Sequence, residues 1–291
     1  MFEGVFPAII TPFKKDLSLD EGGLRRNIEY LGETGIAGIV PCGTTGESAT
    51  LTLDEHKRVV KVAVDCSKVP VIAGTGSNNT AEALELTKHA VDAGADAVLL
   101  ITPYYNKPNE RGMFEHFKAI AERCDIPIIL YNVPKRTSVD LKPDLVAKLA
   151  MVKNIVAVKE ASGSLGQISS ILEKTQGRGF TVLSGDDELT LPIMALGGSG
   201  VISVVANVAP RKMVAMVKAM AEGNLAEARK IHFELAPLTR AMFLETNPIP
   251  VKTACRLLGM AAGPLRLPLA DMTESNEKVL RAELQRSDER P

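Results

Sequence analysis

The segment Ile155-Val156-Ala157-Val158-Lys159 is a short apolar run that ends in a single charged residue. An almost continuous apolar run of this length is typical of a strand buried on both faces of a parallel sheet. The lysine at its end has two interpretations. A lysine held in a water-poor pocket loses proton affinity, and its neutral amine can attack a ketone carbon to form an imine. Alternatively, the strand has simply ended and the ammonium group lies in solvent.

Similar apolar runs recur along the chain at spacings of roughly 25 to 30 residues, as in a (β/α)8 barrel. They lie at residues 5–10, 38–40, 69–73, 97–101, 126–130, 181–183 and 200–205. Between them are helical patterns whose starts place a capping residue three positions before Glu or Gln, at Thr52, Asn79 and Ser164. Eight strand-helix units exceed what an open sheet of five or six strands needs. We therefore predict an α/β fold of the TIM-barrel type, with a doubly wound sheet as the less favoured alternative.

Helical patterns continue after the eighth unit, at residues 225–244, 250–258 and 274–285. No Ser-rich or Gly-rich linker separates them from the preceding sequence, which argues against an independent domain. We expect residues 1–223 to form the barrel and carry the active site. Residues 224–291 should form a C-terminal helical extension packed on that barrel.

The composition excludes several function classes. The 291 residues carry a net charge of −1, so nothing indicates binding to nucleic acid or to an anionic membrane surface. No apolar run approaches the roughly 20 residues of a membrane span, and the N-terminus lacks a basic export segment. The four cysteines are far apart and form no CxxC pair, and the four histidines show no metal-ligand spacing. We expect a cytoplasmic protein that acts on a small molecule without a metal.

The carboxyl ends of barrel strands meet on one face, where active sites of this architecture form. Here these ends are rich in hydroxyl groups, and three of the four tyrosines fall among them. The stretch Gly43-Thr44-Thr45-Gly46-Glu47-Ser48 is either a simple turn before a helix or a nest of backbone N–H groups that holds a carboxylate. Together with a ketone-attacking amine, the nest would suit a 2-oxo acid. Arg136 on the same rim could grip a second carboxylate with its guanidinium fork.

Two acidic features of the rim are assigned structural roles. Glu160 follows Lys159 in the strand, so its side chain should point to the opposite face. Asp186 and Asp187 follow the seventh strand and should cap the next helix. We therefore expect none of these carboxylates to act as the catalytic acid or base.

Three segments of this rim resemble the signatures of the dihydrodipicolinate synthase/N-acetylneuraminate lyase family. They are Gly43-Thr44-Thr45-Gly46-Glu47-Ser48, Tyr131-Asn132-Val133-Pro134 and Val158-Lys159-Glu160. The likeness covers nearly the whole chain. Arg136 and Thr137, which complete a Tyr-Asn-Val-Pro-x-Arg-Thr pattern, favour those members that condense pyruvate with L-aspartate-4-semialdehyde to 4-hydroxy-tetrahydrodipicolinate, in the diaminopimelate route to lysine. The alternative is another pyruvate-dependent Schiff-base aldolase or lyase, of the sugar-acid aldolase or N-acetylneuraminate lyase type. A noncatalytic 2-oxo acid sensor is a third reading.

The resemblance implies roles for the polar residues of the rim. Lys159 would form a Schiff base with pyruvate, and Thr45 with neighbouring backbone N–H groups would hold the pyruvate carboxylate. Tyr131 would shuttle protons, linked through Thr44 to Tyr105 in a hydroxyl relay that a tyrosine of the adjoining subunit completes. No metal or organic cofactor is implied.

The resemblance also implies a second substrate site, an assembly and a regulator. Arg136 would bind the carboxylate of L-aspartate-4-semialdehyde, and main-chain groups of Gly185 and Ile202 would line the pocket. The expected assembly is a homotetramer, built as a dimer of dimers. Lysine would act as a feedback inhibitor between paired subunits, although Leu53 departs from the pattern of lysine-sensitive members. The residues that match that pattern are Ser48, Ala49, His56, Asn78, Glu82 and Tyr104.

Overall fold

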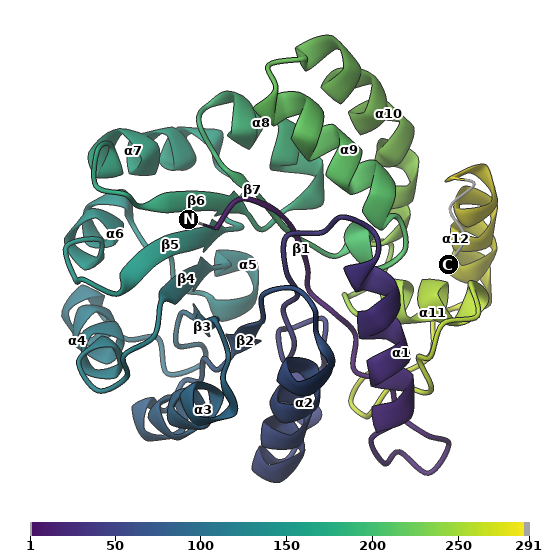
Figure 1. Cartoon of the computed structure of the whole chain (residues 1–291), viewed down its shortest axis with the longest axis horizontal. Coiled ribbons are helices and arrows are strands. Elements are labelled where there is room, and N and C mark those ends of the chain that lie inside the picture. The colour runs from purple at the N-terminus through teal and green to yellow at the C-terminus, as the bar shows by residue number, and fades with distance from the viewer. Residues whose placement is uncertain (1, 288–291) are drawn as a thin grey trace.

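The fold is built on a parallel sheet that curls round the centre of the molecule (Figure 1). The computed structural model describes residues 2–287. Its strands follow the order β1-β7-β6-β5-β4-β3-β2, and every neighbouring pair is parallel. The strands are β1 (Gly4–Pro7), β2 (Ile72–Gly74), β3 (Ala97–Ile101), β4 (Ile128–Asn132), β5 (Ile155–Glu160), β6 (Thr181–Ser184) and β7 (Gly200–Ser203). Seven of the eight predicted apolar runs thus contain a strand.

The eighth run, residues 38–40, fills the gap between β1 and β2 without forming a regular strand. Val40 bridges to Ala8, and Ile39 bridges to Val71, both in parallel. The amide of Ile9 donates to the carbonyl of Val40 at 3.1 Å, and the amide of Ile72 donates to that of Ile39 at 2.9 Å. These bonds close the sheet into a barrel, so the predicted TIM-barrel fold is confirmed. The predicted strand at residues 38–40 is present only as two bridging residues, Ile39 and Val40.

Helices surround the sheet on its outer side (Figure 1). The capping box predicted at Thr52 forms in full, and Ser164 accepts from the amide of Gln167 as expected. At Asn79, however, the side chain accepts from the amide of Ala81, and no box with Glu82 forms. The outer helices are α1 (Glu21–Gly32), α2 (Leu53–Cys66), α3 (Thr80–Ala93), α4 (Glu110–Ala121), α6 (Pro143–Leu149), α7 (Leu165–Thr175), α8 (Thr190–Ala195) and α9 (Pro210–Ala221). The short helix α5 (Pro134–Thr137) follows β4 and lies near the centre of the view in Figure 1. The 3-10 turns are η1 (Ser48–Thr50), η2 (Asp187–Leu189) and η3 (Val205–Asn207).

The chain continues after α9 into three further helices, which are α10 (Leu225–Ala241), α11 (Ile249–Leu257) and α12 (Glu274–Ser287). Helix α10 packs on α9, and α12 packs on both α10 and α11. The predicted boundary between residues 223 and 224 falls in the turn before α10, and the division itself stays a prediction. Residues 288–291 of the predicted extension lie outside the described residues.

Side chains alternate between the inside of the barrel and the layer under the helices, as the pleat of a strand requires. On β4, Ile129 and Tyr131 belong to the inner cluster, whereas Ile128 and Leu130 belong to the outer core. On β5 the inner residue is Ala157 and the outer one is Val158. This alternation fixes the directions of the polar residues that follow. None of the helices within residues 2–287 is long and apolar enough to cross a membrane.

Candidate active site

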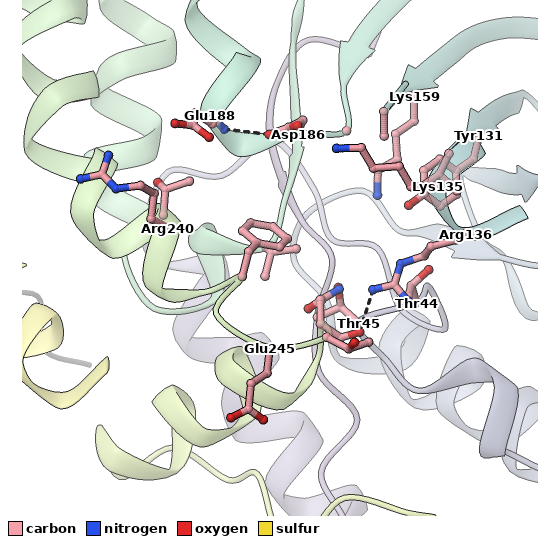
Figure 2. Close-up of a pocket in the computed structure, with 18 residues that line it drawn as sticks. Thr44, Thr45, Tyr131, Lys135, Arg136, Lys159, Asp186, Glu188, Arg240 and Glu245 are labelled. Carbon is pink, nitrogen blue, oxygen red and sulfur yellow. Dashed lines mark hydrogen bonds between the residues drawn. The ribbon is translucent and has the colours of Figure 1, made fainter. Parts of the chain in front are cut away.

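Lys159 points into the barrel because it shares the parity of Ala157 on β5. It is paired in register with Tyr131 of the neighbouring strand β4. The lysine is only 6% exposed, and its Nζ lies 4.2 Å from the centroid of the tyrosine ring. Figure 2 shows the two side chains next to each other at the mouth of the barrel. The strand therefore ends with the amine buried, so the solvent-exposed interpretation of Lys159 is wrong.

Two lysines within residues 2–287 are buried, and their surroundings differ. Lys252 on α11 forms an ion pair with Glu47, with 2.5 Å between Nζ and Oε1. The Nζ of Lys159 makes no ion pair or hydrogen bond to any described residue, and it lies over the face of the Tyr131 ring. A buried cation normally has a partner. The unpaired amine is thus available for covalent chemistry, whereas Lys252 is held by a carboxylate.

A cavity of about 660 Å³ opens above Lys159 at the carboxyl ends of the strands. Its wall combines hydroxyl groups, cations and carboxylates, as Figure 2 shows. The size exceeds that of a three-carbon acid and leaves room for a second small substrate. The lining residues are Thr44, Thr45, Tyr131, Val133, Lys135, Arg136, Lys159, Ala161, Gly185, Asp186, Glu188, Val204, Thr239, Arg240, Phe243, Glu245, Thr246 and Asn247.

The loop from Gly43 to Ser48 presents free backbone donors to this cavity. The amides of Gly46 and Glu47 bond back to the carbonyls of Gly43 and Thr44, at 3.1 and 3.2 Å. Those of Thr44 and Thr45 have no partner among the described residues. Adjacent unpaired N–H groups in a turn form a concavity that favours an anion. This geometry supports the carboxylate-nest reading over the simple turn.

The residue Asn247 joins two predicted site residues, and sequence reasoning did not assign it a role. Its Nδ2 donates to the Thr45 hydroxyl at 3.1 Å, and its carbonyl accepts from Arg136 Nη2 at 2.9 Å. Its Oδ1 is buried without a partner among residues 2–287. The segment Asn247-Pro248-Ile249-Pro250-Val251-Lys252, which also resembles the family named above, is the signal in the sequence that could have indicated it. The segment between α10 and α11 therefore forms a wall of the cavity, which a barrel of residues 1–223 alone would lack.

Gly185 lines the cavity, and the side chain of Lys159 lies against it. A Cβ at this position would lie 3.0 Å from Cγ and 3.1 Å from Cε of Lys159. Two other predicted residues lie elsewhere. Ile202 is buried in the inner cluster of the barrel and does not line the cavity. Tyr105 is 89% exposed and also lies outside the lining.

The acidic neighbours of Lys159 have structural partners. Glu160 points away from the cavity, as predicted, and accepts from Nδ2 of Asn132 at 3.0 Å. Burial raises the pKa of its carboxyl. Asp186 caps η2 by accepting from the amide of Glu188. Asp187 is fully buried and accepts from the hydroxyl of Ser203, and burial raises its pKa to about 6.

A second cavity of about 450 Å³ adjoins the first. It is lined by Ser48, Ala49, His56, Glu82 and Tyr104, which are five of the six residues predicted to bind a regulatory lysine. Asn78 does not line it, and its carbonyl accepts from Asn106 instead. Four residues line both cavities, namely Thr44, Arg136, Thr246 and Asn247. Within the described chain, no three His, Cys, Asp or Glu side chains are grouped closely enough to hold a metal ion.

Residues 1–287 match the dihydrodipicolinate synthetase family. A 4-hydroxy-tetrahydrodipicolinate synthase of Methanothrix thermoacetophila is 71% identical over 281 residues, which cover 97% of this chain and 95% of the relative. One of Methanosarcina acetivorans is 63% identical over 286 residues and covers 98% of both chains.

Solved structures agree with these matches. A dihydrodipicolinate synthase of Acinetobacter baumannii in complex with pyruvate superposes with a TM-score of 0.96, at 42% identity and 99% coverage of both chains. One of Cyanidioschyzon merolae with lysine bound gives a TM-score of 0.95, at 44% identity and 98% coverage of both chains. Sequence and fold are thus matched along almost the whole chain, which belongs to the dihydrodipicolinate synthetase family.

Proposed function

We propose that this enzyme is a 4-hydroxy-tetrahydrodipicolinate synthase that works through an imine on Lys159. It condenses pyruvate with L-aspartate-4-semialdehyde in the diaminopimelate route to lysine. The observation that carries the proposed mechanism is the buried, unpaired amine of Lys159 above which the cavity opens. A buried lysine without a counter-charge is costly, so such a residue is a candidate for a functional role.

The first half of the reaction would use the loop and the lysine together. The pyruvate carboxylate accepts hydrogen bonds from the free amides of Thr44 and Thr45. This places the ketone carbon near Nζ of Lys159, where the neutral amine adds to it and water leaves to give the imine. Loss of a proton from the methyl carbon then yields the enamine. Tyr131, whose ring lies against Nζ, is the proposed proton carrier for these steps.

The second half would join the enamine carbon to the aldehyde carbon of L-aspartate-4-semialdehyde. Arg136 lines the cavity beside Thr44, and its guanidinium is anchored on the Asn247 carbonyl. Its remaining N–H groups can bind the carboxylate of the second substrate. The amine of that substrate then attacks the imine carbon and releases Lys159 as the ring closes. No group outside these side chains and the two substrates is needed for the electron balance.

A second copy of the chain enters the proposal through Tyr105. Its side chain is almost wholly exposed and does not line the cavity that Thr44 lines. We infer that a Tyr105 from an adjoining subunit completes the relay with Thr44 and Tyr131, in a dimer that pairs further into a tetramer. Large exposed aromatic side chains are enriched at such interfaces.

The test combines turnover with borohydride trapping. The wild type should consume both substrates, and reduction in the presence of pyruvate alone should leave one adduct on the peptide that contains Lys159. Lys159→Ala should abolish both signals. Lys135→Ala, which removes another lysine from the same cavity, is the matched control and should still form the adduct. A folded wild type that forms no adduct with pyruvate would reject the mechanism, and an adduct without turnover would redirect the search to other aldehydes.

The second cavity supports a proposal of feedback inhibition by lysine. It offers the Glu82 carboxylate to an ammonium group and the Tyr104 hydroxyl to a carboxylate. Burial raises the pKa of Tyr104, which keeps its phenol protonated as a donor. Millimolar lysine should inhibit the wild type, and Glu82→Gln should weaken that inhibition without changing turnover in its absence. An activity that stays flat as lysine is added would contradict this assignment.

A further inference from the structure

The ion pair between Glu47 and Lys252 joins α11 to the loop that carries the free amides. Both side chains are almost completely enclosed, with exposed fractions of 0% and 2%. Glu47 belongs to the Gly43–Ser48 loop, and Lys252 belongs to α11, which is 205 residues further along the chain. A buried pair of this kind is weak evidence for stability, because the loss of hydration offsets most of the attraction. The ion pair is therefore better explained by an effect on the conformation of the loop than by the stability of the fold.

The backbone of Glu47 adopts a left-handed conformation, with φ of 53° and ψ of 36°. Residues other than glycine adopt this region at a cost, and they are found there where surrounding contacts enforce it. The enforcing contacts here are on the side chain. One carboxylate oxygen accepts from Lys252, and the other accepts from the backbone amide of Arg266 at 3.1 Å. The strained residue is thus clamped at both oxygens.

The other partners of the clamp are also fixed. Nζ of Lys252 lies 4.1 Å from the centroid of the Phe13 ring, and the Arg266 guanidinium carbon lies at the same distance. Arg266 in turn forms an ion pair with Glu55 on α2. Two cations at the same aromatic ring hold the ring in place by cation–π attraction. The carboxylate of Glu47 therefore meets a rigid set of donors.

The same C-terminal segment also reaches the loop at a second point. Asn247 donates to the Thr45 hydroxyl, and the helix that begins at Ile249 carries Lys252. Thr45 and Glu47 are therefore both held from the α11 side, and Thr44 and Thr45, whose amides are unpaired within residues 2–287, line the cavity. Inside the barrel, the hydroxyl of Thr11 donates to the Gly46 carbonyl at 2.7 Å. The loop is fixed on both sides, and the amides of Thr44 and Thr45 are left without a partner within residues 2–287.

The geometry points to Glu47 and Lys252 as positioning residues for the carboxylate half of pyruvate binding. Neither touches the cavity where the reacting atoms would lie. They hold the left-handed turn in the shape that aims two amides at one carboxylate. This inference rests on the proposed function, because it assumes that the loop binds the carboxylate of the ketone that Lys159 attacks.

The test uses the full-length protein and the substitution Lys252→Met, with Arg256→Met as its control on the exposed side of the same helix. The KM for pyruvate should rise roughly tenfold to hundredfold, the range of one or two charge-assisted hydrogen bonds. The kcat at saturating pyruvate should stay within about threefold, because the reacting groups are unchanged. Arg256→Met should leave both constants unchanged.

Borohydride trapping with two ketones separates positioning from general damage. Hydroxyacetone has a ketone but no carboxylate, so its trapping on Lys159 should proceed at the same rate in wild type and Lys252→Met. Trapping of pyruvate should slow in the variant. Equal slowing of both ketones, or an unchanged KM for pyruvate, would overturn the inference. If the wild type traps neither ketone, the proposed function fails instead, so the two failures are distinguishable.

A paired variant guards against unfolding. Lys252→Met alone leaves the Glu47 carboxylate buried without its counter-charge, which is the costly case, whereas Glu47→Gln with Lys252→Met buries no charge. The double variant should fold, trap hydroxyacetone normally and still show the raised KM for pyruvate. A double variant with the wild-type KM would show that the ion pair does not position the loop.

Discussion

Gly185→Ala should slow imine formation because the added methyl group would occupy space that Lys159 uses. A Cβ at this position would lie 2.8 Å from Cβ of Ala161, as well as 3.0 and 3.1 Å from two carbons of the lysine side chain. Non-bonded carbons prefer a separation of about 3.5–4.0 Å, so the lysine must move by roughly 0.5 Å. The backbone of Gly185 is not in the left-handed region, so the effect is steric alone.

The size of the effect follows from that displacement. A shift of about 1 Å at a reacting group costs roughly a hundredfold in rate, so half of it should cost roughly tenfold. Overpacking of a filled site also costs about 1–3 kcal/mol of stability. The variant should therefore remain folded, with a lower melting temperature and an imine that forms roughly tenfold more slowly.

The assay is the initial rate of borohydride-trapped adduct on Lys159, measured by mass spectrometry at saturating pyruvate. Gly166→Ala is the control, because a Cβ there would meet nothing closer than 4.0 Å and the residue lies in α7. It should leave the trapping rate unchanged. A Gly185→Ala protein that is trapped at the wild-type rate would refute the claim that this glycine makes room for the lysine.

Three further outcomes follow from the site and the core. Thr45→Val should raise the KM for pyruvate about tenfold, because Nδ2 of Asn247 loses its acceptor and the loop loses that contact, and an unchanged KM would contradict this. Arg136→Lys should raise the KM for L-aspartate-4-semialdehyde roughly tenfold or more while that for pyruvate changes less, since an ammonium cannot replace the guanidinium fork. His116 is buried with its pKa lowered to about 4, so it binds protons more readily in the unfolded chain. Its contribution to stability is present above the ordinary pKa of 6.5 and is lost as the pH falls towards 4. Between pH 7 and pH 5, the free energy of unfolding should fall by about 2 kcal/mol less in His116→Gln than in the wild type, as measured by urea unfolding. Equal decreases in the two proteins would disprove this.

The barrel could be predicted from the sequence because buried parallel strands carry continuous apolar runs, and these are visible without any partner. The run at residues 38–40 was located correctly, yet it forms only bridges. Regular pairing needs matched backbone over several residues, and Pro41, which has no N–H, follows the run directly. Asn79 caps its helix as expected, but its side chain accepts from Ala81 and forms no box with Glu82, which lies in the wall of the second cavity.

The site was predicted where strand ends carry it, as for Lys159, Tyr131 and the Gly43–Ser48 loop. Strand alternation and the rule that barrel sites form at carboxyl ends are enough to bring such residues together. Asn247 and the segment from Thr239 onward were missed, because their approach depends on how α10 and α11 pack, and no local pattern specifies that. The outward direction of Tyr105 was likewise invisible, since it follows from a positive φ of 68° in the turn after β3.

The separation of Glu47 from Lys252 has a consequence for the protein during its synthesis. The two residues are 205 positions apart, so a ribosome that adds roughly 5–20 residues per second needs about 10–40 s to deliver the second after the first. Throughout that interval the carboxylate lacks its counter-charge, and the turn that would bind pyruvate lacks its clamp. If the loop binds pyruvate as proposed, the nascent barrel should bind it only weakly until α11 has emerged. Pyruvate in the cell should therefore stabilise the finished chain more than the growing one.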